Sequence, residues 1–335
     1  MILQYGIRRL FRTMSPKLFA LVGISLIGII VLHQLSYVED LAFASPLSES
    51  INLTKACPLS EPDHAHDTRT RIASGIPKLV HQIWKTADIH TYSTETSHES
   101  WKTSFEALNY TIKLWAEDDI VRLIKAKYSW LLPMYEGYSY NIQRADLARL
   151  VVVHAEGGIY ADLDVYPMTV ERIDCVRQLG LQAIFAPTAG NLGVSNHFFM
   201  AERGSSFLQW ALEEAKRRSG STSRRILLPY LRVFWSTGPM MVTFAFLEYI
   251  CMFSPADHYL SVLEERYGKS VIQHKAGRSW HGLDGYLLNW FADNFSMQTL
   301  WLSILLFVVI AGLMCVMVRC SQRNRSPAMR SSFRI

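Results

Sequence analysis

The stretch RADLARLVVVHAEGGIYADLDVYP, from Arg144 to Pro167, carries the signals that decide how this chain of 335 residues folds. Its first part belongs to a largely apolar segment, residues 141–156, whose length and composition predict a mostly buried helix. Gly157-Gly158 is the expected end of that helix, because glycine readily adopts the backbone conformation of a helix C-cap. Residues 159–161 then predict a short strand that leads directly into Asp162-Leu163-Asp164.

Two carboxylates at the end of this strand indicate a cation site. Asp162 and Asp164 are separated by one residue, and their oxygens can converge on one hard cation, such as Mg²⁺ or Mn²⁺ bridging a diphosphate. A lone D-x-D pair is a weak signal, because exposed acidic pairs are common. Here the pair follows a strand, a double glycine and a helix on which Asp146 and Arg149 share one face. The conjunction favours a site over a solvated strand end, although Asp146 and Arg149 by themselves could form a simple intrahelical ion pair.

Outward from this stretch, strand and helix patterns alternate. Short β-rich runs at residues 78–84 and 110–115 predict strands, and the segments 99–108 and 117–127 predict helices. Further along, residues 182–186 predict a strand, and residues 205–218 and 237–253 predict helices. Alternating strands and helices are typical of an α/β domain with a partly parallel sheet.

The basic excess of the chain lies at its two ends. The 34 basic and 29 acidic residues give a formal net charge of +5. Nine of the basic residues precede the first apolar run or follow the last one: Arg8, Arg9, Arg12, Lys17, Arg319, Arg323, Arg325, Arg330 and Arg334. The middle of the chain is therefore slightly acidic, which excludes a nucleic-acid-binding protein, because such a protein needs a basic folded surface.

The two apolar runs predict membrane segments. Residues 299–318 contain no charged residue and are long enough for a helix to cross a bilayer core, and residues 18–35 are almost as apolar. The basic residues outside both runs place both ends in the cytosol and residues 38–297 in the secretory lumen. Ala42-Phe43-Ala44 also matches a signal-peptidase site, so cleavage there is the alternative to an uncleaved anchor. The five cysteines do not reveal their pairing.

These features predict six consecutive parts of the chain. They are a cytosolic N-terminus (1–17), a transmembrane signal anchor (18–37), a luminal stalk (38–75), a luminal catalytic domain (76–297), a second transmembrane helix (298–318) and a basic cytosolic tail (319–335).

Five sequence blocks resemble one known family in the same order. The D-x-D region resembles the sugar-binding region of glycosyltransferase family 32, and the chain is similar to the fungal mannosylinositol phosphorylceramide synthases of that family. The other blocks are IPKLVHQIWKT (Ile76 to Thr86), GVSNHFFMA (Gly193 to Ala201), STGPMM (Ser236 to Met241) and GRSWHG (Gly277 to Gly282). Each block alone is modest evidence, but the set is specific.

The resemblance implies a GT-A-type nucleotide-sugar glycosyltransferase domain, here flanked by two transmembrane helices, that uses GDP-mannose and Mn²⁺ or Mg²⁺. By position in the motifs, Asp164 and His281 would ligate the metal, and Asp162 would hold the ribose and sugar side of the donor. Asp146 and Arg149 would bind the donor sugar hydroxyls. The predicted catalytic residues are Asp146, Arg149, Asp162 and Asp164. The remaining donor contacts would be Trp84, which stacks on the base, and Asn196, Ser279 and Trp280.

Several of these residues have plainer explanations, and two positions depart from the family pattern. Trp84 could be a core residue, and Asn196 could cap a turn. The family has Asp at the position of His197 and Ser at the position of Arg278, which weakens a role for the first and adds a cation beside the proposed diphosphate site. The basic segment 216–225 (KRRSGSTSRR) fits a solvated loop, and its functional alternative is to grip the phosphate of an anionic lipid headgroup.

The sequence thus predicts a retaining mannosyltransferase of the Golgi membrane that acts on inositol phosphorylceramide, together with a small membrane regulatory subunit that the resemblance implies. The alternatives are a related α-mannosyltransferase acting on N-glycans or polysaccharides and a non-catalytic membrane scaffold. A D-x-D phosphatase is discounted, because Tyr166 occupies a position where that class needs Thr or Val.

Overall fold

The computed structural model describes residues 23–26, 28–30, 33–34, 36–38, 51–57, 75–92, 96–188, 193–253, 259–275 and 282–294. The chain divides into two compact units, Met1–Trp280 and His281–Ile335. The first unit contains the sheets and every helix that bears on the candidate site. In the second unit the structure describes one helix, α14 (Leu283–Asn294).

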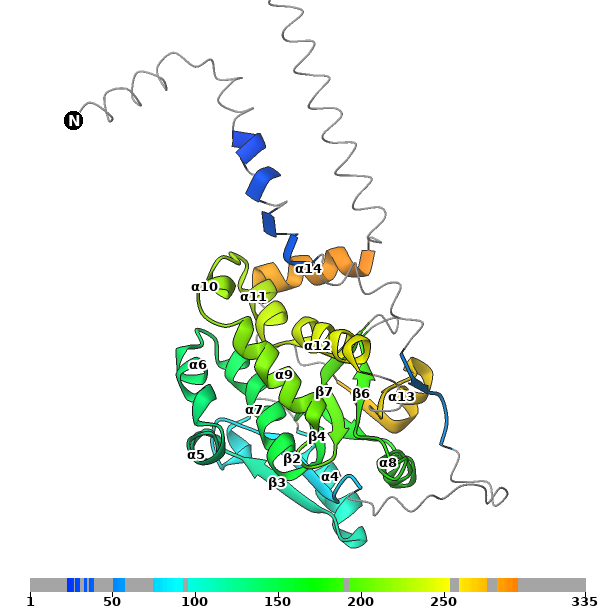
Figure 1. Cartoon of the computed structure of the whole chain (residues 1–335). Helices are drawn as coiled ribbons and strands as arrows, with labels where there is room; N and C mark the ends of the chain where they lie inside the picture. Colours follow the sequence, from blue (N-terminus) through cyan, green and yellow to red (C-terminus); the bar gives the residue numbers. More distant parts are fainter. Residues whose placement is uncertain are drawn as a thin grey trace, which may run out of the picture. The chain divides into compact units, whose positions relative to one another are not determined.

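A seven-stranded mixed sheet forms the centre of the first unit, with strand order β1-β8-β6-β7-β4-β2-β3 (Figure 1). Four of its six strand pairs are parallel and lie in two groups on either side of β7, which runs antiparallel to both of its neighbours. The strands are β1 (Leu53–Thr54), β2 (Leu79–Ile83), β3 (Thr111–Trp115), β4 (Gly158–Ala161), β6 (Ala183–Pro187), β7 (Val194–Ala201) and β8 (Leu260–Leu263). A second, two-stranded sheet pairs β5 (Val165–Pro167) with β9 (Ile272–His274) in antiparallel fashion.

Helices cover both faces of the large sheet. One face packs against α5 (Glu117–Lys127), α6 (Leu132–Gly137), α7 (Asn141–Glu156), α9 (Ser206–Arg217) and α12 (Pro239–Met252). The other packs against α4 (His98–Phe105), α8 (Val170–Arg177) and α13 (Glu265–Val271). Two further helices, α10 (Ser221–Arg224) and α11 (Pro229–Ser236), follow α9 in the chain.

Each face of the large sheet carries its own hydrophobic core, and successive buried residues along a central strand belong alternately to one core and the other. On β7, Phe199 belongs to the core under α7 and α9, whereas Phe198 and Met200 belong to the core under α4 and α8. Phe185 and Ile184 divide in the same way on β6. Successive side chains of a strand point to opposite faces, so these apolar strands can supply both cores only because neither face meets solvent.

Most of the elements expected from the sequence are present. The helices expected at 117–127 and 141–156 have those bounds in the structure, and the strands expected at 78–84, 110–115, 159–161 and 182–186 are found within one or two residues. The α/β architecture with a partly parallel sheet is therefore confirmed.

The predicted flank of two transmembrane helices is corrected by the structure. Among its described residues, no helix combines the length and apolar character needed to cross a membrane. Within the first expected segment the described residues form short helical pieces at 23–26, 28–30 and 33–34, and the second, 299–318, lies outside the described residues.

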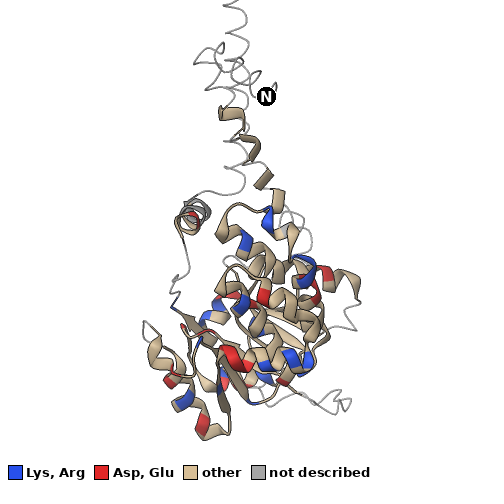
Figure 2. Cartoon of the chain, turned by 90° about the vertical axis from the view of Figure 1, so that its left-hand side faces the viewer, with Lys and Arg blue, Asp and Glu red and all other residues tan. Residues whose placement is uncertain are grey.

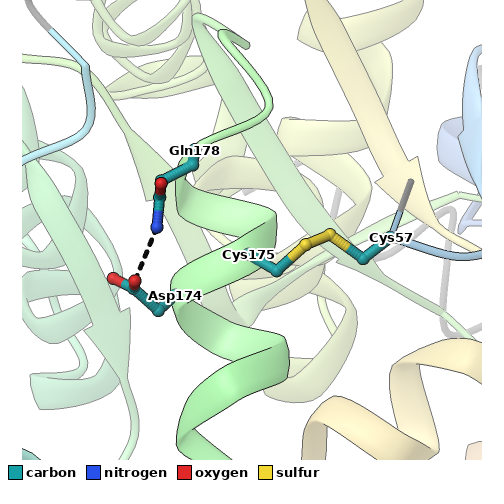
Figure 3. The surroundings of a disulfide bond; sticks show 4 residues. All are labelled: Cys57, Asp174, Cys175 and Gln178. Carbon is teal, nitrogen blue, oxygen red and sulfur yellow. Dashed lines mark hydrogen bonds between the residues drawn. A yellow bond between two sulfur atoms is a disulfide. The ribbon is translucent and has the colours of Figure 1, made fainter. Parts of the chain in front are cut away.

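The segment before the domain joins it at two points. Leu53–Thr54, in the range expected as a stalk, forms β1 and pairs in parallel with β8 at the sheet edge. Cys57 then forms a disulfide with Cys175 on α8, with Cα atoms 6.2 Å apart, a separation typical of disulfides (Figure 3). Beside it, Gln178, the residue that follows α8, donates a hydrogen bond through its Nε2 to Asp174 (Figure 3).

Candidate active site

The D-x-D segment occupies the sharp turn between β4 and β5. The amide of Asp162 donates to the carbonyl of His197 on β7 at 2.9 Å, and the amide of Val165 donates to the carbonyl of Asp162 at 3.0 Å. Leu163 is buried, and its carbonyl accepts a hydrogen bond from the amide of Ser97 at 2.7 Å. The turn is thus fixed by its neighbours on both sides, and its two carboxylates are held at the end of β4.

Gly157 and Gly158 bring the helix α7 close to this turn. Both have positive φ angles, 70° and 110°, and a Cβ atom on Gly158 would lie 2.6 Å from the carbonyl oxygen of Leu79. His81 on β2 adds a tie, because its Nε2 lies 2.8 Å from the carbonyl oxygen of Gly157. Only residues without a Cβ fit here, so the double glycine is what lets β4 start directly after α7.

A buried ion cluster joins α7 to the D-x-D turn. The guanidinium of Arg149 lies 3.2 Å from Asp146 Oδ1 and 3.3 Å from Asp162 Oδ2, and it donates to the carbonyl of Asn196 at 3.1 Å. Asp146 in turn accepts hydrogen bonds from Asn196 Nδ2 and Thr237 Oγ1, both at 3.0 Å. The structure therefore brings together four residues singled out from the sequence: Asp146, Arg149, Asp162 and Asn196.

Tyr160 completes the surroundings of Asp162. Its hydroxyl donates to Asp162 Oδ1 at 2.7 Å, and its ring lies beneath the Arg149 guanidinium, 5.1 Å from ring centre to carbon. Tyr160 and Thr237 were not identified from the sequence as site residues. Tyr160 lies on β4, two residues before Asp162, and residues with this spacing along a strand point to the same face. The spacing is the sequence signal that could have identified Tyr160 as a site residue.

Burial sets the protonation behaviour of the cluster. It raises the pKa of Asp146 to about 6, even though Arg149, Thr237 and Asn196 oppose that shift. Burial also raises the pKa of Asp162, and Arg149 again opposes the change. For Arg149 burial acts to lower the pKa, but the charges of Asp162, Tyr160 and Asp146 outweigh it and raise the pKa. Two carboxylates, the buried Asp146 and the partly exposed Asp162, thus share one buried guanidinium.

Asp164 lies beside a pair of histidines on the other side of the turn. Its Oδ1 is 3.5 Å from His274 Nε2, and the His274 ring stacks on that of His197 with centroids 4.2 Å apart. Burial and the neighbouring His274 lower the pKa of His197 to about 3, so that imidazole is neutral. His197 also hydrogen-bonds Ser195 Oγ through its Nδ1. His274 reaches this position through the β5–β9 pairing, which local sequence patterns do not reveal.

The donor groups around Asp164 are compatible with Mg²⁺ or Mn²⁺. Carboxylate oxygen suits both ions, and such cations commonly use one or two protein carboxylates and take their other ligands from phosphates and water. Among the described residues, no group of three or more His, Cys, Asp and Glu side chains is arranged to hold a metal ion. The protein would thus supply a minority of the ligands, with Asp164 as the carboxylate.

Trp84 follows β2 at the same sheet edge. Strands β2 and β4 are parallel neighbours, so their carboxyl ends, followed by Trp84 and Asp162, meet at one edge. The indole Nε1 of Trp84 donates to Thr91 Oγ1 at 2.6 Å, and its ring meets Tyr92 edge to face. The ring remains partly exposed. The predicted site residues Ser279, Trp280 and His281, and the variant position Arg278, lie outside the described residues.

Known proteins are similar in sequence to this chain. Residues 77–178 match the family model "Glycosyltransferase sugar-binding region containing DXD motif". Inositol phosphoceramide mannosyltransferase 1 of Schizosaccharomyces pombe is 28% identical over 262 residues, which cover 77% of this chain and 78% of the relative. Mannosyl phosphorylinositol ceramide synthase SUR1 of Saccharomyces cerevisiae is 30% identical over 225 residues, covering 64% of this chain and 54% of the relative. These matches confirm the resemblance drawn from the motifs.

A more distant relative and one solved structure extend the comparison. The initiation-specific alpha-1,6-mannosyltransferase of Saccharomyces cerevisiae is 28% identical over 142 residues, covering 38% of this chain and 29% of the relative. The structure titled "PaToxG Glycosyltransferase" aligns with a TM-score of 0.39 and 16% identity, covering 66% of this chain and 79% of that chain. That structural likeness is remote.

Proposed function

Because the chain is a glycosyltransferase with the DXD-containing sugar-binding region, we propose that it transfers mannose from GDP-mannose to inositol phosphorylceramide. The observation that carries the proposal is the buried cluster of Asp146, Arg149 and Asp162 immediately beside Asp164. The names of the relatives support the choice of sugar and acceptor, since the relatives that align over most of this chain are inositol phosphoceramide mannosyltransferases.

In the proposed reaction the bond between the anomeric carbon of mannose and the diphosphate oxygen breaks. A new bond forms between that carbon and a hydroxyl oxygen of the inositol, on the same face of the sugar. The hydroxyl proton passes to the departing diphosphate, so GDP leaves as the second product and no separate base is required.

The residues of this chain hold the donor for that step. A divalent cation at Asp164 supplies, when bound, Lewis-acid stabilisation of the charge on the leaving diphosphate. Asp162 would contact the ribose and sugar side, and Asp146 and Arg149 would bind the sugar hydroxyls through their lone pairs and N–H groups. Because this cluster is buried, each such hydrogen bond is stronger than it would be in water.

We also propose that the enzyme works in the Golgi lumen. The Cys57–Cys175 disulfide supports an oxidising compartment, because such bonds form and persist along the secretory route and are rare in the cytosol. A small membrane regulatory subunit stays a prediction of the family resemblance. Fluorescence microscopy of the tagged full chain against a Golgi marker tests the location, and a cytosolic signal would contradict it.

The function is tested with the full chain, GDP-mannose, inositol phosphorylceramide and Mn²⁺. Mass spectrometry should detect the acceptor with one added hexose, and NMR of the product should show the α-anomer. Asp164→Asn should lower turnover about a hundredfold or more. Asp118→Asn, the same change at an exposed position of α5, is the matched control and should leave turnover unchanged.

Three results would contradict the proposal. They are full turnover in excess chelator, transfer from another nucleotide sugar in preference to GDP-mannose, and transfer to N-glycan acceptors with none to inositol phosphorylceramide. The third result would instead favour the kind of activity named for the initiation-specific mannosyltransferase.

A further inference from the structure

A cavity of about 440 Å³ lies next to the ion cluster, between the segment around α6 and the helices α7, α9, α10 and α11. Its wall includes the side chains of Trp130, Tyr138, Gln143, Lys216, Arg224 and Arg232. We call this cavity the cationic pocket. No residue proposed above to hold the nucleotide sugar or the metal lines it, so it is separate from the donor contacts.

The charged residues that line the cationic pocket are all positive. Its lining contains three cations, Lys216, Arg224 and Arg232, and no carboxylate. The two residues that follow Lys216 on the chain, Arg217 and Arg218, both pair with Glu214. For the three pocket cations, by contrast, the described part of the chain provides no carboxylate partner.

Two of these cations are held in place by uncharged groups. Lys216 Nζ lies 5.0 Å from the centre of the Trp130 ring. The guanidinium of Arg232 donates to the carbonyl of Ile226 at 3.0 and 2.7 Å, which leaves its charge uncompensated. A pocket built this way favours an anionic ligand, because positive charges that are fixed and unpaired need no rearrangement to bind one.

Tyr138, which lines the same pocket, carries a buried hydroxyl that is unpaired within the described part of the chain, and this is a second observation that points to a ligand. Tyr138 is only 8% exposed, and its hydroxyl has no hydrogen-bond partner among the described residues. Burial and the charge of Asp146 raise the pKa of Tyr138, so the hydroxyl keeps its proton and can donate. An unpaired buried hydroxyl is costly, and a bound acceptor atom would satisfy it.

The cationic pocket is linked to the donor-sugar residues through a short chain of contacts. Gln143, which lines the pocket, donates to Ser236 Oγ at 2.8 Å. The next residue, Thr237, donates to Asp146, which lies one helical turn after Gln143 on α7. One turn of helix advances about 5 Å, so a small ligand in the pocket would lie close to a sugar held at Asp146.

Apolar residues adjoin the basic segment that contributes to the pocket. Leu227 is 59% exposed, and its amide donates to Gln34 Oε1 at 2.7 Å. The helical pieces before Gln34 expose further large apolar side chains, among them Ile24, Leu26 and Ile29. Gln34 Nε2 also donates to the carbonyl of Arg225 at 3.3 Å, so these pieces lead into the end of the domain near α10 and α11, where Figure 2 shows Lys and Arg positions. Cationic and apolar surfaces side by side suit an anionic amphiphile.

We propose that the cationic pocket binds the phosphodiester of the acceptor headgroup and thereby presents a hydroxyl of its inositol ring to the donor sugar. This inference rests on the proposed function for the identity of the acceptor. It assigns Lys216, Arg224, Arg232 and the Tyr138 hydroxyl to the phosphodiester. The site is distinct from the diphosphate site of the donor, and it makes the enzyme selective for acceptors that carry a negative charge.

Calorimetric titration of the full-length protein with myo-inositol 1-phosphate tests the inference directly. The double variant Lys216→Gln/Arg224→Gln should weaken binding by about tenfold or more, because two charge-assisted contacts are lost. Arg225→Gln is the matched control: it removes an equally exposed cation from the same segment but does not line the pocket, and it should change binding less than twofold. The affinity for GDP should be the same in all these proteins.

Tyr138→Phe separates a binding role from a structural one. The hydroxyl has no partner in the described protein, so its removal should leave the melting temperature unchanged or raise it. If the hydroxyl donates to the phosphodiester, the same variant should bind myo-inositol 1-phosphate about tenfold more weakly. A lower melting temperature with unchanged binding would overturn this assignment.

Other results would overturn the pocket as a whole. Equal losses in Arg225→Gln and the double variant would mean diffuse surface charge, and binding of inorganic phosphate as tight as that of myo-inositol 1-phosphate would mean a free-phosphate site. The proposed function and the pocket can also fail separately. If no mannose is transferred but the variants lose binding, only the function fails; if mannose is transferred and the acceptor KM is unchanged in the variants, only the pocket fails.

Discussion

The substitution Asp146→Asn should remove one specific part of the pH dependence of stability. Both carboxylate oxygens of Asp146 accept hydrogen bonds in the buried cluster, and burial raises its pKa to about 6 from an ordinary value of 3.8. Asparagine can keep the contact to Asn196 through its oxygen and meet the Thr237 hydroxyl with its amino group. The variant should therefore fold, but it cannot bind the proton.

The sign of the effect follows from the raised pKa. Between pH 3.8 and about 6 the folded protein holds a proton on Asp146 that the unfolded chain has released, so this contribution to the free energy of unfolding is complete below pH 3.8 and is lost as the pH rises through about 6. A separation of about 2 pKa units corresponds to roughly 3 kcal/mol in total. Relative to the variant, the wild type should gain on the order of 1 kcal/mol when the pH falls from 7 to 5.

Urea unfolding followed by tryptophan fluorescence at several pH values between 4.5 and 7.5 measures this difference. Asp118→Asn, at an exposed carboxyl, is the control for the loss of one carboxylate as such. The quantity compared is the free energy of unfolding of the wild type minus that of Asp146→Asn. If this difference is the same at all pH values, or is larger at pH 7 than at pH 5, then Arg149 keeps Asp146 ionised throughout and the reasoning from burial is refuted.

Three further substitutions are checked by the same unfolding measurements. Arg149→Met leaves the buried Asp146 and the partly exposed Asp162 without their shared cation and should lower the free energy of unfolding by about 3–5 kcal/mol at pH 7; a loss below about 1 kcal/mol would contradict the buried cluster. His81 has a pKa lowered to about 4, chiefly by burial, so relative to His81→Gln the wild type should lose roughly 3 kcal/mol as the pH falls from 6.5 to about 4. Cys57→Ser opens a disulfide whose ends, Cys57 and Cys175, are 118 residues apart and should cost about 2–5 kcal/mol, whereas Cys251→Ser, at an exposed free thiol, should cost almost nothing.

The elements with strong local signals could be predicted from the sequence. The helix 117–127 begins with three acidic residues and ends with lysines, and α7 ends at a double glycine, so their bounds follow from the charges and backbone preferences near each end. The strand β7 was recognised only as a family block and not as a strand. Three consecutive polar residues, Ser195, Asn196 and His197, precede an apolar run in β7, so the segment lacks the alternation that identifies a strand.

The parts of the site that were missed depend on contacts between distant segments. His274 meets Asp164 because β9 pairs with β5, and Thr237 meets Asp146 across 91 residues of sequence. No local sequence pattern indicates either of these contacts. The predicted set of Asp146, Arg149, Asp162 and Asn196 could be assembled in advance only because family motifs already encode such long-range proximity.

The attachment of β1 and Cys57 to the domain bears on how the enzyme can be shortened for laboratory work. A fragment trimmed to start at Ile76 retains the whole ion cluster, and sequence motifs alone would suggest it as the minimal soluble version. It would nevertheless leave β8 as a bare sheet edge, open to pairing with other molecules, and Cys175 as a lone thiol. Recombinant fragments that include residues 51–57 should therefore resist aggregation better than those that begin at Ile76.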